Sequence, residues 1–210
     1  RVPALAQVSK QGFVFILDRR DGQPLFPVQE RAVPVSTIAG EAAWPTQPFP
    51  TQPPPLLPTR LTPDDAWGLT FWDRNRCRDA IAGLHNEGIF TPLAERPTLL
   101  FPGSLGGANW GGGAYSPQTQ QLIINVNAAP FVAQLIRGAT AATGQDHPVA
   151  GQKTMFVTMQ GTPYTLAVGP LLSPLGIPCT APPWGKLVAV NLAQGRIAWE
   201  APLGSVHEMG

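Results

Sequence analysis

One sequence pattern occurs twice in this chain, once near each end. Each copy is an apolar run followed by an Asx residue, a glycine and an aromatic residue, at the same spacing. The two copies are 14–17 with Asp18, Gly22 and Phe26, and 187–190 with Asn191, Gly195 and Trp199. An apolar run predicts a buried strand, and Asx followed by glycine predicts a turn. Repeated strand–turn–aromatic units are typical of β-propellers, so we expect the chain to form part of a circular, mainly β assembly.

The composition favours long irregular loops around an adequate core. The 210 residues include 25 prolines and 22 glycines, which is well above the usual share of both. Apolar residues make up 43% of the chain, so it can still bury a core. Prolines are dense between residues 29 and 60, and there we expect extended loop without regular pairing.

The charge distribution excludes several kinds of partner. The formal net charge is +1 and the basic residues are scattered, so we expect no nucleic-acid partner. No apolar run reaches the roughly 18 residues that a membrane-spanning helix needs. An apolar run begins soon after Arg1 and another ends shortly before Gly210. We therefore expect the chain to be a segment of a longer polypeptide.

The pattern between the repeats predicts one blade with two large insertions. We expect the middle hairpin of the blade at 114–126 and a further hairpin at 154–168. The insertions are predicted at about 29–97 and 128–184, with long Pro- and Gly-rich loops. Several consecutive short blades would fit the distance between the repeats, but they do not fit the helical and Pro-rich stretches.

A small helical region is predicted inside the first insertion. Thr62 is followed by a proline and two aspartates, which together have the composition of a helix N-terminus. A second helix is expected at about 73–84. Asp73, Arg78 and Asp79 are expected to form ion pairs on the surface of that helix.

The cysteines and histidines give little sign of a metal site. Cys77 and Cys179 are far apart and belong to no Cys-x-x-Cys or Cys/His cluster, so zinc is not expected. Two separate buried thiols are the favoured interpretation, and a disulfide is the alternative if the protein resides in an oxidising compartment. His85, His147 and His207 have no acidic partner at a useful spacing and are expected at the surface.

The segment 10–22, with the sequence KQGFVFILDRRDG, resembles the pyrroloquinoline quinone (PQQ)-dependent dehydrogenases, and within them the membrane-bound glucose and quinate/shikimate branch. Further segments resemble this branch, in order, along nearly the whole chain. These segments are 46–49, 87–92, 101–103, 130–132, 172–179 and 183–185. The repeats resemble the tryptophan-docking motif of the family, in which the aromatic residue of one blade packs between its neighbours. Phe26 and Trp199 are therefore expected to be structural.

The resemblance implies a fold and an activity. The fold would be an eight-bladed β-propeller, to which this chain contributes about one decorated blade and flanking strands, packed against the remaining blades of the same polypeptide. The activity would be the oxidation of a sugar or cyclic polyol, such as glucose, quinate or shikimate, with PQQ as cofactor and ubiquinone as electron acceptor. The chain would belong to the periplasmic domain of an inner-membrane-anchored enzyme.

The resemblance also implies that part of the catalytic machinery lies outside this chain. Ca²⁺ or Mg²⁺ would accompany PQQ, and the metal ligands and the catalytic aspartate of the family would precede Arg1. Later cofactor contacts would follow Gly210. We therefore expect the segment alone to be inactive.

Four positions are expected to bind the cofactor. Lys10 matches the lysine that contacts the quinone oxygens in this family, and its ammonium suits a site where negative charge develops during the reaction. Asn125, at the end of an expected strand, matches an asparagine near the cofactor. Asn109 and Trp110 lie in the glycine-rich segment 103–113, where the alcohol-dehydrogenase branch carries an asparagine that touches PQQ.

Each of these positions also has a structural interpretation. Lys10 would then be a solvated turn residue, Asn125 an Asx-turn residue and Trp110 a packing residue. For the whole protein, the corresponding alternative is a propeller-type binding or scaffolding module that kept the repeats without the chemistry. Lys10 and the insertions favour the enzyme, because a scaffold does not need them.

Overall fold

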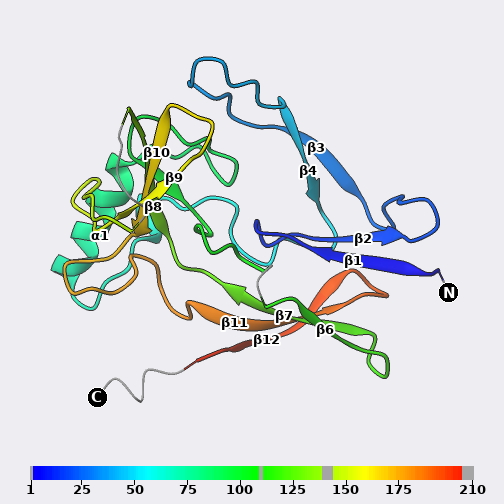
Figure 1. Cartoon of the computed structure of the whole chain (residues 1–210). Helices are drawn as coiled ribbons and strands as arrows, with labels where there is room; N and C mark the ends of the chain where they lie inside the picture. The colour runs from blue at the N-terminus through cyan, green and yellow to red at the C-terminus, as the bar shows by residue number, and fades with distance from the viewer. Residues whose placement is uncertain (1, 109–110, 139–143, 205–210) are drawn as a thin grey trace.

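The computed structural model describes residues 2–108, 111–138 and 144–204 (Figure 1). Strands dominate these residues, and their helical structure consists of the 3₁₀ turn η1 (Pro63–Asp65) and the helix α1 (Phe71–Gly83). The strands are β1 (Ala4–Val8), β2 (Val14–Asp18), β3 (Val28–Ala32), β4 (Thr46–Pro50), β5 (Thr98–Leu100), β6 (Gly113–Ser116), β7 (Gln121–Asn127), β8 (Phe131–Arg137), β9 (Met155–Thr158), β10 (Tyr164–Pro170), β11 (Gly185–Asn191) and β12 (Arg196–Pro202). The mainly β fold class predicted from the sequence is confirmed.

The first part of the fold is an antiparallel sheet with the strand order β12–β11–β7–β6. It contains the hairpin predicted at 114–126, which forms β6 and β7. The hairpin of β1 and β2 packs against this sheet, and their apolar side chains form one buried cluster. The cluster includes Val14, Ile16, Ile124, Val126, Val188 and Val190. We call the sheet and the β1–β2 hairpin the blade region.

The two sequence repeats adopt the same local structure. In each copy the glycine N–H donates to the carbonyl oxygen of the Asx residue at 2.8 Å. The glycine has a positive φ, which is 76° at Gly22 and 58° at Gly195. Asp18 Oδ1 accepts from the Arg20 N–H, and Asn191 Oδ1 accepts from two N–H groups of its own turn. The Arg20 guanidinium also donates to the Asp18 carboxylate and lowers the pKa of Asp18 to about 2.

The aromatic residue of the first repeat packs on the turn of the second. A Cβ atom built on Gly195 would lie 2.8 Å from Phe26 Cε1 and 2.7 Å from Gln52 Cγ. The Gln52 amide also donates to a carbonyl of this turn at 2.7 Å. Phe26 thus has the packing role predicted for it. Trp199, its counterpart, is 39% exposed, and its Nε1 donates to Gln121 Oε1 at 3.2 Å.

Replacing Gly195 by alanine is expected to lower the free energy of unfolding by about 2 kcal/mol, because the added methyl group clashes with Phe26 and Gln52 and because alanine is strained at this φ. The matched control is Gly22→Ala, since a Cβ atom on Gly22 would have no neighbour within 4 Å. That variant should lose only about 1 kcal/mol, from backbone strain. Urea unfolding of the intact protein measures both losses, and equal losses would contradict the docking contact.

The second part of the fold is built mostly from segments within the two predicted insertions, and its strand β5 begins just after the first of them. Its sheet has the strand order β5–β8–β10–β9, and α1 lies beside it at the left of Figure 1. One buried cluster contains Cys77 and Ile81 of α1, Val132 of β8, Ala167 of β10 and Cys179 from the chain after β10. Segments of the two insertions therefore share one hydrophobic core. We call α1, β5, β8, β9, β10 and this core the disulfide-linked module.

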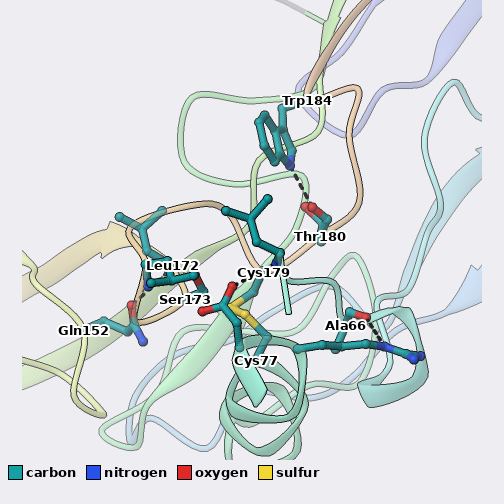
Figure 2. Close-up of a disulfide and its surroundings, with 12 residues drawn as sticks. Ala66, Cys77, Gln152, Leu172, Ser173, Cys179, Thr180 and Trp184 are labelled. Atoms are coloured by element: carbon teal, nitrogen blue, oxygen red, sulfur yellow. Dashed lines mark hydrogen bonds between the residues drawn. A yellow bond between two sulfur atoms is a disulfide. The ribbon is translucent and has the colours of Figure 1, made fainter. Parts of the chain in front are cut away.

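Cys77 and Cys179 form a disulfide at the centre of this module (Figure 2). Both cysteines are fully buried, and the bond joins positions with a sequence separation of 102. Close to Cys179, the Thr180 carbonyl accepts a hydrogen bond from Trp184 Nε1 at 2.7 Å (Figure 2). The favoured interpretation of two separate thiols is wrong, because the tertiary fold brings the face of α1 against the chain that follows β10.

The prediction of unpaired loop throughout 29–60 is also wrong. β3 and β4 form an antiparallel ribbon that includes Pro48 and Pro50. Both strands of a two-stranded ribbon are edge strands, which tolerate proline. The predicted helix start at Thr62 is the short turn η1. α1 begins at Phe71, two residues earlier than expected. No helix in the described part of the chain is long and apolar enough to cross a membrane.

The polar residues of α1 differ from the predicted pattern of surface ion pairs. Asp73 is fully buried, and its Oδ2 accepts from the Leu69 N–H before the helix. Its own N–H donates to the Thr70 hydroxyl, which caps the helix. Arg78 pairs with Asp64 of η1 at 3.1 Å. Asp73 therefore holds the start of the helix, and Arg78 links the helix to the preceding turn.

The prediction that the histidines are surface residues is wrong for His85. Its side chain is only 7% exposed, and its Nε2 lies 2.7 Å from Glu87 Oε1. Residues two positions apart do not face each other on a helix, but here the loop after α1 brings the two side chains together. His147 is half-buried and stacks on Phe156, with 4.6 Å between the ring centroids. His207 lies outside the described residues.

Candidate functional site

Lys10 lies in the tight turn between β1 and β2. The Ser9 carbonyl accepts from the Gly12 N–H, and Ser9 donates to the Phe13 carbonyl, both at 3.0 Å. Gly12 has a φ of 75°, which allows the chain to reverse there. The Lys10 side chain is exposed, and its Nζ donates to the Ser104 carbonyl at 3.5 Å. The fold thus presents a cation at a fixed turn while leaving most of its hydrogen-bonding capacity unused.

The glycine-rich segment connects the Lys10 turn to the end of β7. The Gly107 N–H donates to the Lys10 carbonyl at 2.6 Å, and the Gly107 carbonyl accepts from the Asn127 N–H at 2.7 Å. A Cβ atom on Gly107 would lie 2.9 Å from Leu57 Cδ1 and 3.2 Å from the Lys10 carbonyl oxygen. A larger residue would require the Leu57 side chain and the crossing backbone to shift, so glycine favours this close crossing. The segment therefore fixes the position of the Lys10 turn relative to β7.

Asn125 is on β7 and contacts the other end of the glycine-rich segment. Along this strand, Ile124 and Val126 face the core, so Asn125 lies on the opposite face. A Cβ atom on Gly111 would lie 3.1 Å from Asn125 Cβ and 3.2 Å from its Nδ2. Asn125 Oδ1 is buried and has no hydrogen-bond partner in the part of the chain that the structure describes. A buried amide oxygen without a partner is unusual and points to a missing donor.

Asn109 and Trp110 lie outside the described residues. Their neighbours on both sides are described, and these neighbours contact the Lys10 turn through Gly107 and Asn125 through Gly111. Lys10 and Asn125 therefore border the same segment, at its two ends.

A cleft of about 270 Å³ opens beside Lys10, between the blade region and the disulfide-linked module. Lys10 and Gln11 line it from the β1–β2 turn. The other lining residues are Gly88, Ile89, Thr91, Leu99, Leu100, Phe101, Pro102, Gly103 and Ser104. Among the described residues, Asn125 does not line this cleft. The structure thus separates the predicted residues into a cleft residue, Lys10, and a residue under the glycine-rich segment, Asn125.

The opposite wall of the cleft is the part of the site that the sequence analysis missed. It comes from 88–91 and 99–104, and both stretches overlap segments that resemble the dehydrogenase family. Gln11 was missed as well, although it follows Lys10 directly. The resemblance was the available signal for these residues, but their position opposite Lys10 depends on how the module packs against the blade region.

The described residues contain no group of three or more His, Cys, Asp or Glu side chains that could hold a metal ion. Among the described residues that line the cleft, Lys10 is the charged one. A cation next to a mixed polar and apolar wall can bind an anionic or electron-rich group and can stabilise developing negative charge.

The whole sequence matches one known protein family. All residues, 1–210, match the family described as the PQQ glucose/ethanol/alcohol dehydrogenase, β-propeller domain. The chain belongs to this family. Membership accounts for the paired repeats and the four-stranded blade sheet, and it confirms that the chain is β-propeller sequence.

Individual members of the family are similar to the chain over nearly its whole length. It is 38% identical to "Quinoprotein glucose dehydrogenase A" of Acinetobacter calcoaceticus, covering 99% of the chain and 26% of that protein. It is 39% identical to "Probable quinate dehydrogenase (quinone)" of Xanthomonas campestris pv. juglandis, covering 99% of the chain and 27% of that protein. It is 35% identical to "Glycerol dehydrogenase large subunit" of Gluconobacter oxydans, covering 100% of the chain and 30% of that protein. The PQQ-family chain thus spans about a quarter of the length of these relatives.

Proposed function

We propose that this chain is part of a PQQ-dependent dehydrogenase that oxidises a sugar or cyclic polyol in the periplasm and passes the electrons to membrane ubiquinone. Membership of the family and the names of the relatives, which act on glucose, quinate and glycerol, support this substrate class. The observation that carries the proposal is the exposed Lys10 ammonium beside a cleft, on the β1–β2 turn that precedes the first repeat.

The residues of this chain have a donor set that suits PQQ, a tricarboxylated ortho-quinone. Lys10 offers ammonium N–H groups to quinone or carboxylate oxygens, and we assign it the catalytic role of stabilising negative charge there. Asn125 offers an amide N–H₂ to a carboxylate, and its Oδ1, which has no partner among the described residues, can accept from a ring N–H. We assign Asn109 and Trp110 to the cofactor as well. When bound, PQQ supplies the two-electron acceptor for alcohol oxidation.

We further propose that the Ca²⁺ or Mg²⁺ ion and the general base are supplied by other parts of the polypeptide. In the family, the cation serves as a Lewis acid at the cofactor. The chain would then contribute a partial propeller domain over 1–210, with the insertions at about 29–97 and 128–184 added to one blade. Their shared core in the disulfide-linked module supports treating the two insertions as one structural addition.

The Cys77–Cys179 disulfide supports the periplasmic location. Disulfides form and persist in oxidising compartments, which include the bacterial periplasm. A dehydrogenase domain in that compartment, anchored to the inner membrane, could deliver electrons directly to ubiquinone. Reduction of a soluble ubiquinone analogue by membranes containing the protein is the assay for this acceptor.

The proposal is tested on the full-length protein. We expect dye reduction that depends on added PQQ and Ca²⁺ with at least one substrate of a panel containing glucose, quinate, shikimate and glycerol. Omission of PQQ is the control and should abolish the signal. If PQQ and Ca²⁺ support no dye reduction with any member of the panel, the non-catalytic binding or scaffolding module becomes the better assignment.

A further inference from the structure

The two walls of the Lys10 cleft differ in chemistry. The wall from the β1–β2 turn carries an ammonium at Lys10 and a carboxamide at Gln11. The opposite wall, from β5 of the disulfide-linked module and the loops on either side of β5, is largely apolar, with Ile89, Phe101 and Pro102. At about 270 Å³ the cleft lies just below the volume range of sites for drug-sized ligands, roughly 300–1,000 Å³. It therefore suits a small ligand with one polar edge and one apolar face.

Gln11 has unused hydrogen-bonding capacity. Its side chain is half-buried and has no hydrogen-bond partner among the residues that the structure describes. The backbone beside Gln11 is held in place by two hydrogen bonds of Gly12. The Gly12 N–H donates to the Ser9 carbonyl, and the Gly12 carbonyl accepts from the Leu56 N–H at 2.9 Å. A carboxamide both donates and accepts, so it matches a hydroxyl group, which does the same.

Ile89 is presented by a rigid loop, residues 85–91, which we call the Ile89 loop. The Glu87 N–H donates to Thr91 Oγ1 at 2.8 Å, and the Gly88 N–H donates to Asn86 Oδ1 at 3.2 Å. The Thr91 hydroxyl and N–H both donate to the Gly88 carbonyl. These bonds restrain the loop backbone on both sides of Ile89, whose half-buried side chain lines the cleft. A preorganised wall loses little conformational entropy on binding and so favours selectivity.

The Ile89 loop is also joined firmly to the rest of its module. The His85 N–H donates to the Pro97 carbonyl, and the Leu99 N–H donates to the His85 carbonyl, both at 2.9 Å. Leu99 belongs to the buried cluster that contains the disulfide. The apolar wall is therefore positioned by the core of the disulfide-linked module, and the polar wall by the blade region.

We propose that Gln11 and Ile89 are specificity-determining residues that contact the substrate from opposite sides of this cleft. Gln11 binds a hydroxyl group next to the reacting part of the substrate, and Ile89 packs on the C–H face of its ring. A cyclic polyol has both features, because its hydroxyl groups project around a ring whose faces carry C–H groups. This inference rests on the proposed function and names the residues that select the substrate at the same site.

Gln11 is tested with Gln11→Met, which keeps the side-chain length and removes the amide. In the full-length holoenzyme, we expect kcat/KM for the best substrate of the panel to fall about tenfold. For one analogue of that substrate lacking a single hydroxyl group, the variant and the wild type should have equal kcat/KM, because the hydroxyl that Gln11 binds is absent. Gln7→Met is the control, since Gln7 lies outside the cleft. A loss that is the same for the parent substrate and for every deoxy analogue overturns the assignment of Gln11.

Ile89 is tested with Ile89→Ala and the milder Ile89→Val. We expect KM to rise about tenfold in the alanine variant and less in the valine variant, with kcat within about twofold of the wild type, because ground-state packing is lost. Leu175→Ala is the control, since Leu175 is exposed and does not line the cleft. PQQ affinity, measured by titration of the apoenzyme, should be unchanged in all variants.

Unchanged KM in both Ile89 variants, or a loss of PQQ affinity equal to the loss of kcat/KM, overturns the assignment of Ile89. Thermal unfolding identifies any variant that loses activity by losing its fold. If Ile89→Ala is such a variant, the KM of Ile89→Val tests the assignment. Failure of this inference is distinct from failure of the proposed function. In the first case the wild type still turns over the substrate, whereas in the second no member of the panel supports dye reduction.

Discussion

The Lys10→Ala variant of the full-length protein is expected to lose kcat by about 10²- to 10³-fold. The reason is electrostatic: the exposed ammonium at the cleft is the cation that we assign to the quinone oxygens, and alanine leaves no charge there. The fold should be unaffected. The Lys10 side chain makes one long hydrogen bond, at 3.5 Å to the Ser104 carbonyl. The 2.6 Å hydrogen bond from the Gly107 N–H to the Lys10 backbone carbonyl does not involve the side chain, so it survives the substitution.

Dye reduction measures the turnover of the variant, and PQQ titration measures its affinity for the cofactor. Lys10→Arg keeps the positive charge but changes its shape, so we expect it to retain more activity than the alanine variant. Lys153→Ala is the control, because Lys153 is exposed and outside the cleft. Turnover of Lys10→Ala within about threefold of the wild type, at saturating PQQ, would remove Lys10 from the mechanism and favour its interpretation as a solvated turn residue.

The parts of the fold that were predicted correctly depend on short-range patterns. The two repeat turns are determined by local hydrogen bonds and by a glycine with positive φ, at Asp18–Gly22 and at Asn191–Gly195. The repeat could therefore be found from the sequence alone. The hairpin at 114–126 was similarly visible, because alternating burial and a short turn are local properties. The repeat also indicated a circular β assembly, and the family resemblance added the expectation of eight blades.

The parts that were predicted wrongly depend on contacts between distant segments. The pairing of Cys77 with Cys179 requires α1 and the chain after β10 to share a core, and nothing in either segment indicates the other. The core shared by segments of the two predicted insertions was not predicted, because its side chains come from positions far apart in the sequence. The β3–β4 ribbon was hidden by its prolines, and the burial of Asp73 could not be inferred from a helix pattern that is polar on most faces.

The candidate site was only partly accessible from the sequence for the same reason. Lys10 was identified because it lies within a recognisable motif, and the structure brings it to a cleft. Asn125 was identified from the same resemblance, and its buried Oδ1 without a partner is a feature that only coordinates can reveal. The opposite wall at Ile89 required the packing of one part of the fold against the other. The residues proposed to select the substrate therefore depend on tertiary packing, whereas the proposed cofactor contact at Lys10 could be found from a sequence motif.

Removing the disulfide is expected to lower the free energy of unfolding by about 4–5 kcal/mol. The bond closes a sequence separation of 102, and cross-linking positions this far apart restricts the unfolded chain strongly. Cys77→Ala/Cys179→Ala is the direct variant, and urea unfolding of the intact protein, followed by a probe in the disulfide-linked module, measures the loss. A loss below about 1 kcal/mol would contradict this account.

Reduction provides an independent form of the same experiment. Both cysteines are fully buried in the core of the module, so dithiothreitol should leave the native disulfide intact and reduce it only when the module opens. The reduced protein, prepared by unfolding in dithiothreitol and refolding, should match the double-alanine variant in stability. Because the same core positions the Ile89 loop, both forms should also show a higher KM than the oxidised protein, with PQQ affinity unchanged. Rapid reduction of the native protein would mean that the disulfide-linked module opens readily. That result would contradict the proposal that the core of the module positions the apolar wall of the cleft.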